Sequence, residues 1–269
     1  MKSNISAYLL LIFLIINALG FSERVIAAPA PEAAASLEGN IFYDRLGTDG
    51  RWISHDRLGW VWTPYNVPTD WRPYTVGHWL YSDYGWTWVS DEKWGWATYH
   101  YGRWYFDANF GWVWAPGTMW GPAWVSWRYG EGYIGWAPLP PEAVWDAGTG
   151  PSVNWEDIDE FIPPHWYSFV EERYLTDNYL QERIMQPLRN DTLVDMTKNI
   201  TAYEIKDNRI LNSSLDVTRI ERETGMTINR YQITDARSTE DLRVNRVSGN
   251  QIKFYRPTIT RAELERAPR

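Results

Sequence analysis

Four histidines are the side chains of this sequence best suited to hold a metal ion. They are His55, His78, His100 and His165. Tetrahedral zinc needs ligands that converge on one point. When the repeats described below are aligned, the first three histidines occupy three different positions: a turn, the residue after a glycine, and a linker. They are therefore not equivalent residues of the repeat. With no cysteine in the chain to add thiolates, we predict no metal site.

Carboxylates that recur near expected turns are the next candidates for chemistry. They are Asp56, Asp83 and Asp107. A glycosidase needs two carboxylates that face each other across a cleft. A catalytic pair is usually unique, whereas turn aspartates repeat because they hydrogen-bond the local backbone. No Gly-x-Ser-x-Gly, His-Glu-x-x-His or phosphate-binding glycine loop is present. We therefore predict no catalytic residue, no cofactor and a protein that is not an enzyme.

These residues sit on an internal repeat. Gly-[Arg/His]-Trp, a short turn and Gly-Trp-x-Trp follow one another three times, as "GRWISHDRLGWVW", "GHWLYSDYGWTW" and "GRWYFDANFGWVW". A diverged fourth copy reads "WGPAWVSWRYGEGYIGWAPLPP". Aromatic residues favour strands, and the polar connections favour turns, so each copy predicts a β-hairpin. A lone hairpin is marginally stable, so neighbouring copies must stack or join one sheet.

Tryptophan supplies much of the expected core. Between residues 41 and 140, tryptophans outnumber isoleucine, leucine, valine and methionine together. The two indoles of each Gly-Trp-x-Trp unit lie two residues apart and project from one face of a strand. We predict that this face packs inward and that most tryptophans are scaffold.

The opposite face carries the candidate ligand-binding residues. In "GRWYF", Trp104 and Phe106 share one face, so Arg103 and Tyr105 share the other. The corresponding positions in the first two copies are Arg51 and His78. Cationic groups interleaved with aromatic rings suit a polyhydroxylated ligand. We predict that Arg51, His78, Arg103 and Tyr105 form an outward binding face; ordinary solvated edge residues are the alternative.

The two ends of the chain differ in character from the repeats. Lys2, the apolar run Ala7–Ile16 and Val25-x-Ala27 predict a signal peptide over 1–27, followed by an Ala/Pro-rich linker over 28–40. After the repeat domain (41–141), an acidic connector (142–160) leads to a small α+β domain (161–257) and a polar tail (258–269). Within that domain we predict a helix in "SFVEERYLTDNYLQERI", a hairpin in "TAYEIKDNRILN", a helix in "SLDVTRIERETG" and strands in "TINRYQITD" and "QIKFYRP".

The run "GWVWAPGTMWGPAWVSWRYGEGYIGWAPLPP" with its preceding Gly-Arg-Trp units resembles a family of exported bacterial proteins with tryptophan-rich repeats. The downstream "NITAYEIKDNRILN" and "DVTRIERETG" are similar to the C-terminal half of that family. The family is uncharacterised in function, so the resemblance implies no reaction, cofactor or catalytic residue.

These observations predict a mainly β protein: repeated antiparallel β-hairpins rich in tryptophan, followed by a small α+β C-terminal module. A formal net charge of −8 disfavours nucleic acid as a partner, and no membrane-spanning segment is expected after signal cleavage. We expect a non-enzymatic protein of the cell envelope, periplasmic or extracellular, whose repeats bind a cell-wall or extracellular glycan. A structural or protein-interaction module with all tryptophans packed is the alternative, and a glycan-cleaving enzyme is the weaker one.

Overall fold

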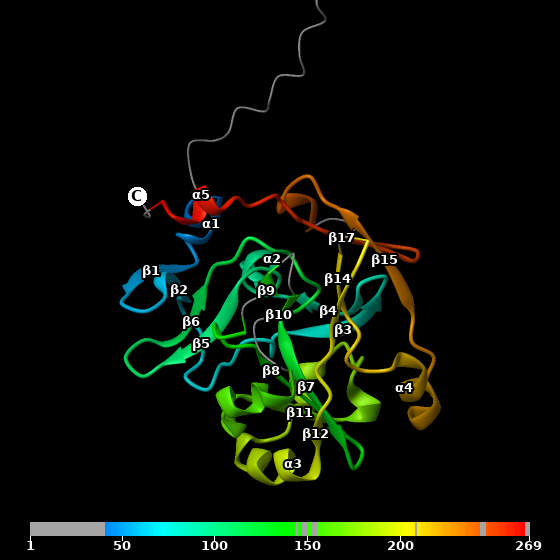
Figure 1. The fold of residues 1–269 in the computed structure, drawn as a ribbon. Coiled ribbons are helices and arrows are strands. Elements are labelled where there is room, and N and C mark those ends of the chain that lie inside the picture. Colours follow the sequence, from blue (N-terminus) through cyan, green and yellow to red (C-terminus); the bar gives the residue numbers. More distant parts are fainter. Residues whose placement is uncertain are drawn as a thin grey trace, which may run out of the picture. The chain divides into compact units, whose positions relative to one another are not determined.

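The computed structural model describes residues 41–143, 145–146, 150–151, 155–207, 209–242 and 246–266. The predicted signal peptide (1–27) and linker (28–40) lie outside these residues. The described residues belong to one compact unit, Glu38–Arg269. The unit is mainly β with a few short helices, which confirms the predicted fold class (Figure 1).

Four antiparallel hairpins follow one another in the first half of the chain. Their strands are β1 (Gly50–His55) with β2 (Gly59–Pro64), β3 (Gly77–Ser82) with β4 (Gly85–Ser90), β5 (Arg103–Asp107) with β6 (Gly111–Ala115), and β7 (Val125–Gly130) with β8 (Tyr133–Pro138). In each hairpin two tryptophans lie directly opposite: Trp52–Trp62, Trp79–Trp88, Trp104–Trp114 and Trp127–Trp136. Such cross-strand aromatic pairs stabilise a hairpin. The diverged fourth copy therefore folds as predicted.

The glycine that opens each repeat is required by the neighbouring strand. Gly102 has φ +68°, and a Cβ atom there would lie 2.1 Å from the carbonyl oxygen of Ala115. Only glycine accommodates both this left-handed backbone and the close approach. The glycine of the Gly-Arg-Trp motif is thus explained by the packing of the hairpin.

The first and third hairpins join in a four-stranded sheet of order β1-β2-β6-β5. Trp62 pairs with Trp114 across its centre, so four indoles cross the sheet in one row with Trp52 and Trp104 at its ends. The tryptophans of this face pack inward as predicted, but Phe106, which shares the face with Trp104, is 42% exposed. The opposite face is covered as well, because Val61 and Val113 are fully buried.

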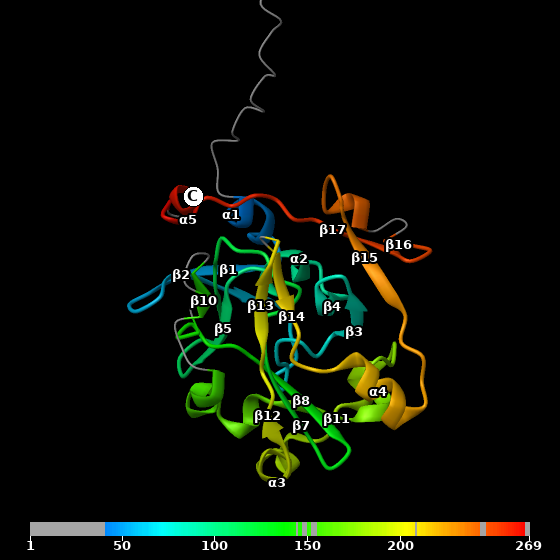
Figure 2. The ribbon, with the colours of Figure 1, turned by 45° about the vertical axis from the view of Figure 1, so that its right-hand side comes forward.

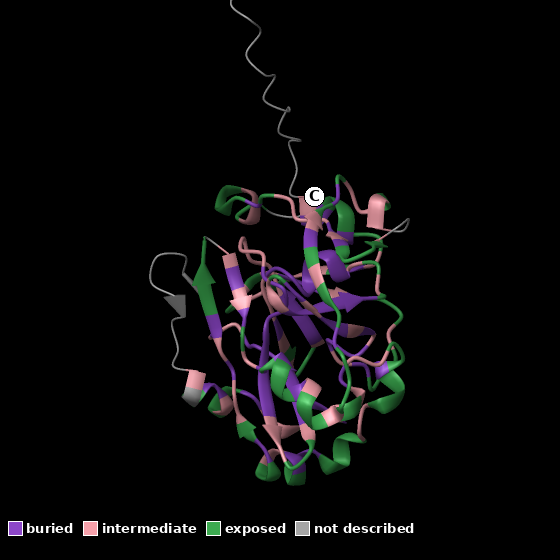
Figure 3. Cartoon of the chain, turned by 90° about the vertical axis from the view of Figure 1, so that its right-hand side faces the viewer, coloured by how far each residue is buried: buried purple, intermediate pink, exposed green. Residues whose placement is uncertain are grey.

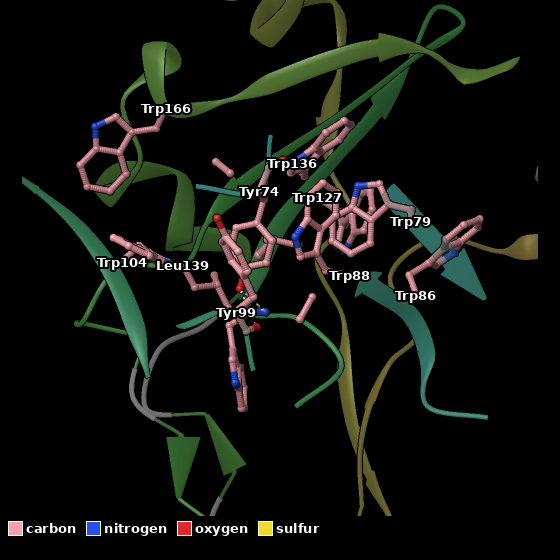
Figure 4. Close-up of a cluster of buried hydrophobic side chains, with 14 of the residues drawn as sticks. Tyr74, Trp79, Trp86, Trp88, Tyr99, Trp104, Trp127, Trp136, Leu139 and Trp166 are labelled. Atoms are coloured by element: carbon pink, nitrogen blue, oxygen red, sulfur yellow. Dashed lines mark hydrogen bonds between the residues drawn. The ribbon is translucent and has the colours of Figure 1, made fainter. Parts of the chain in front are cut away.

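The second and fourth hairpins meet through their aromatic rings. The ring of Trp79 lies 4.5 Å from that of Trp127 and 5.8 Å from that of Trp136, between centroids. Tyr74 stacks on Trp79 and contacts Tyr99 at 4.6 Å (Figure 4). Buried residues run through the central strands, whereas exposed residues lie on the outer loops and helices (Figure 3). The core is therefore built of indoles and phenols where most proteins use aliphatic side chains.

Strands from the C-terminal half enter the sheets of the hairpins. One sheet has the order β11-β8-β7-β12, and the largest has the order β13-β14-β4-β3-β15-β17-β16 (Figure 2). The added strands are β11 (Ser168–Glu171), β12 (Lys198–Asn199), β13 (Tyr203–Lys206), β14 (Arg209–Asn212), β15 (Arg230–Asp235), β16 (Val247–Ser248) and β17 (Gln251–Phe254). The structure thus differs from the expected pair of separate folding units, because the edges of the hairpin sheets are completed by these strands.

The predicted acidic connector (142–160) is also packed where the structure describes it. Ile158 is fully buried. The carboxylate of Asp159 forms an ion pair with Arg128 and accepts a hydrogen bond from the Tyr167 hydroxyl at 3.0 Å. The acidic residues of this stretch therefore include a partner for a buried arginine of the fourth hairpin.

The remaining elements are short. They are α1 (Ile41–Leu46), α2 (Gly95–Thr98), β9 (Trp145–Asp146), β10 (Gly150–Pro151), η1 (Trp155–Phe161), η2 (Pro164–Trp166), η3 (Glu172–Tyr174), η4 (Leu180–Arg183), η5 (Pro187–Arg189), α3 (Asn190–Met196), α4 (Val217–Thr224), η6 (Glu240–Leu242) and α5 (Arg261–Leu264), where η marks 3₁₀ turns.

Most of the C-terminal elements agree with the sequence, and two do not. The hairpin β13–β14, the strands β15 and β17 and the helix α4, which ends at Gly225, are confirmed. The predicted helix over residues 168–184 is wrong: Phe169 and Val170 are both buried, and this segment begins as strand β11 beside β8. The polar tail (258–269) is not frayed where described, since Ile259 is buried and Thr260 caps α5.

Candidate functional site

A cleft of about 670 Å³ lies beside the first sheet. Its lining comes from the start of β1, the loop of residues 65–72 that follows β2, the tip of the β5–β6 hairpin, and His165 and Pro187. This volume is in the range of small-molecule sites. The hairpins therefore leave a concave surface large enough for one or two sugar rings.

Exposed aromatic rings distinguish this cleft from the rest of the repeat region. Tyr65 is 46% exposed, Phe106 42% and Phe110 38%, and all three line the cleft. Trp71 and Trp112 line it too, although each is only 8% exposed. Most rings of the hairpins are buried, so this gathering of accessible rings is a local feature.

The turn of the β5–β6 hairpin explains why Phe110 is exposed. The carboxylate of Asp107 accepts hydrogen bonds from the backbone amides of Asn109, at 2.7 Å, and Phe110, at 3.0 Å. Gly111 follows with φ +70°, which only glycine adopts readily. These amides also lower the pKa of Asp107, as the carboxylate is the better acceptor. The predicted turn role of the repeated aspartates is confirmed at Asp107.

Two arginines give the cleft its charge. Arg51 is exposed and forms no ion pair with a described carboxylate. Arg72 donates from Nη2 to the Ser168 hydroxyl at 3.3 Å, and its Nε has no hydrogen-bond partner among the described residues. Burial lowers the pKa of Arg72, and the nearby carboxylate of Asp70 opposes this shift. Asp70, His165 and the phenol of Tyr65 are the other ionisable side chains of the described lining.

The partly buried carboxyl group of Glu92 holds one wall of the cleft in place from the side of the core. Trp71 donates from its indole to Glu92 at 2.7 Å, and the Tyr99 hydroxyl donates to the other carboxyl oxygen. Burial raises the pKa of Glu92 to about 7. The ring of Trp71 is thereby held in one orientation between the cleft and the core.

The structure does not bring the four predicted binding residues together. Arg51 lines the cleft, but His78 lines a separate pocket beside β3. Arg103 stacks on Trp124, with its guanidinium carbon 3.9 Å from the ring centroid, and donates to the carbonyl oxygens of Ala143 and Gly102. Tyr105 lies under Arg57, whose guanidinium carbon is 4.9 Å from its ring centroid. One of the four therefore belongs to the cleft.

The histidines are equally scattered. His55 contacts Asp107, His78 is partly buried and its pKa is lowered by burial, and His100 stacks on Trp120 in the core. Among the described residues, no three His, Asp or Glu side chains are grouped so as to hold a metal ion. Within the same residues, no helix is both long and apolar enough to cross a membrane.

The segment that forms the four hairpins also matches the model of a protein family. Residues 43–143 match the model of DUF6600, a family of unknown function. The match begins in α1 and ends after β8, so it includes all four hairpins. Comparison with curated proteins and with solved structures gives no significant match. The resemblance to an uncharacterised family is thus supported over the hairpins, and the DUF6600 match assigns them no activity.

Sequence reasoning missed Tyr65, Phe110 and Arg72 as members of a site. All three lie outside the paired strands: Tyr65 directly after β2, Phe110 at a turn, and Arg72 in the loop between the first two hairpins. An aromatic residue in a turn has no opposing strand to cover it. That position, rather than its place in the repeat, is the signal by which Tyr65 and Phe110 could have been found.

Proposed function

We propose that this protein is a non-enzymatic binding protein of the cell envelope and that its cleft binds a cell-wall or extracellular glycan. The observation that carries the proposal is the group of exposed rings, Tyr65, Phe106 and Phe110, in a cleft that also contains Arg51. Aromatic faces stack on the CH faces of sugars, and guanidinium groups donate hydrogen bonds to hydroxyls and carboxylates.

The two alternatives have less support. Glycan cleavage by acid–base chemistry uses a pair of carboxylates. In the described lining of the cleft, Asp70 is the one carboxylate. A purely structural role accounts for the buried indoles, but it does not explain why three aromatic rings are exposed in the cleft.

Export is the second part of the proposal. It rests on Lys2, the apolar run Ala7–Ile16 and the small residues before Ala28, which together have the pattern of a cleaved signal peptide. Mass spectrometry of protein recovered from the envelope or the medium should find an N-terminus near Ala28. Recovery of the uncleaved chain from these fractions would refute this part.

Binding is tested by retention of the folded protein on peptidoglycan and on a panel of immobilised polysaccharides. A Phe106→Ala/Phe110→Ala variant should lose affinity by roughly tenfold or more, because the apolar surface of two rings is removed. Tyr179→Ala is the matched control, since Tyr179 is 70% exposed and does not line the cleft. The proposal fails if the parent is retained on no glycan, or if the control loses as much as the cleft variant.

A further inference from the structure

Arg51 and Arg72 are among the described arginines that form no ion pair with an acidic side chain. Arg57 pairs with Glu142, Arg128 with Asp159 and Arg230 with Glu221. Neither cleft arginine forms an ion pair with any described residue, although Asp70 lines the same cleft. Two cations that form no ion pair therefore share one concave surface with the exposed rings.

Arg72 is the more unusual of the two. It is partly buried, its Nε is shielded from solvent, and the Ser168 hydroxyl is a neutral acceptor. Asp70 is near enough to act on Arg72 electrostatically but forms no ion pair with it, and a guanidinium removed from water without a full set of acceptors is costly. An anion in the cleft would offset that cost through the solvent-facing part of the guanidinium.

The charge of the cleft is opposite to that of the chain. The formal net charge of the protein is −8, yet two arginines and one aspartate line this surface. Charges more than about 8 Å away are largely screened at physiological ionic strength. The local cations, rather than the overall charge, therefore decide which ligands the cleft accepts.

We infer that the cleft selects saccharides that carry a carboxylate, with Arg51 and Arg72 as its anion-binding groups. The inference rests on the proposed glycan-binding function and adds the chemical class of the sugar. The rings of Tyr65, Phe106 and Phe110 would contact the apolar faces of the saccharide. Its carboxylate would accept charge-assisted hydrogen bonds, for which the planar guanidinium is suited.

Such a carboxylate has two sources, namely a uronic acid and the lactyl ether of a muramic acid. The experiment uses one matched pair of probes for each. Oligogalacturonate is compared with its methyl ester, and N-acetylmuramic acid with N-acetylglucosamine, by calorimetry on the full-length protein at low and high salt. In at least one pair the acid should bind about tenfold more tightly than its neutral partner, the strength expected of hydrogen bonds to a charged group.

The variants identify the groups responsible. Arg51→Gln should weaken binding of the acid far more than binding of the neutral probe and so abolish the preference for the acid, and Arg72→Gln should do the same where circular dichroism shows it folded. Arg237→Gln is the control, because Arg237 is also exposed and forms no ion pair in the described part of the chain but lies outside the cleft. High salt should weaken binding of the acid only.

The outcomes separate the inference from the function on which it rests. Equal binding of acid and neutral probes overturns the inference and leaves glycan binding intact. An equal loss in Arg51→Gln and Arg237→Gln also overturns it, since the attraction is then unspecific. Binding of no saccharide by the folded parent overturns both.

Discussion

The first and third hairpins have nearly the same residues and meet in one sheet, yet the arginine of the first is exposed whereas that of the third is only partly so. Both begin Gly-Arg-Trp and end Gly-Trp-Val-Trp. Both oppose a tryptophan to a tryptophan at the same point, Trp52 to Trp62 in β1–β2 and Trp104 to Trp114 in β5–β6. The repeated pattern therefore determines the hairpin itself.

Even the turns of the two hairpins are held alike, by different side chains. His55 and Asp107 occupy equivalent positions, four residues before the glycine with which the second strand of each hairpin begins. The Nδ1 of His55 accepts from the backbone amides of Arg57 and Leu58, both at 3.2 Å, as Asp107 accepts from those of Asn109 and Phe110. Because Nδ1 is an acceptor, Nε2 carries the hydrogen and donates to Asp107 at 3.3 Å.

The difference between the hairpins comes from what other elements place against them. Arg103 is stacked on Trp124 and bonded to two carbonyl oxygens, and burial lowers its pKa to about 10. Arg51 has no such neighbours and lines the cleft. The repeat thus supplies the same cation twice, and tertiary packing stacks one on a tryptophan and leaves the other exposed in the cleft.

The largest expected contrast between the two hairpins lies in their opening tryptophans. Trp104 is 1% exposed and contacts Trp62, Trp71 and Tyr99, whereas Trp52 is partly exposed. Trp104→Ala should lower the free energy of unfolding by about 3–5 kcal/mol, the range for large buried rings. Trp52→Ala should cost roughly half as much or less, because less surface is uncovered. Urea unfolding measures both, and equal losses would remove the distinction.

The arginines give the next contrast. Arg103→Ala removes a cation–π contact and two hydrogen bonds to carbonyl oxygens, so it should lower the free energy of unfolding by about 2 kcal/mol. Arg51→Ala should change it by less than about 0.5 kcal/mol, as expected of an exposed residue without partners. Arg103→Lys is a useful intermediate, because it keeps the charge without the planar group that stacks. If Arg51→Ala were as destabilising as Arg103→Ala, the assignment of Arg51 to a binding cleft would be wrong.

The parts of the fold that follow from local pattern could be predicted from the sequence. Alternation within "GWVW" gives the strand and its two faces, and the turn residues give the hairpin. The cap at Asp216 and the αL residue Gly225 likewise delimit α4. Each of these signals depends only on residues near one another in the chain.

The rest depended on contacts between distant residues. Phe169 was assigned to a helix because its spacing suits one, but pairing with β8 buries it in a strand. Arg103 was assigned to an outward face because alternation places it opposite Trp104, but Trp124 covers it. Alternation reveals which side of a strand a residue occupies and not what lies beyond that side. Alternation therefore predicts the same outward position for Arg51 and Arg103, although only Arg51 lines the cleft.

The smallest effect concerns the contact between the two turns, where His55 and Asp107 meet. Asp107→Asn should lower the free energy of unfolding at neutral pH by about 1 kcal/mol or less, because a weaker acceptor replaces the carboxylate. The backbone amides of Asn109 and Phe110, with His55, lower the pKa of Asp107 in the folded state. Its stabilising contribution is therefore present above the unfolded-state pKa of about 3.9 and is lost as the pH falls through the lower folded-state pKa. Urea unfolding of parent and variant should show a gap at pH 7 that closes at strongly acidic pH. A gap of the same size at both would mean that the amide and the carboxylate differ in packing rather than in charge, and the parallel between the two turns would then rest on geometry alone.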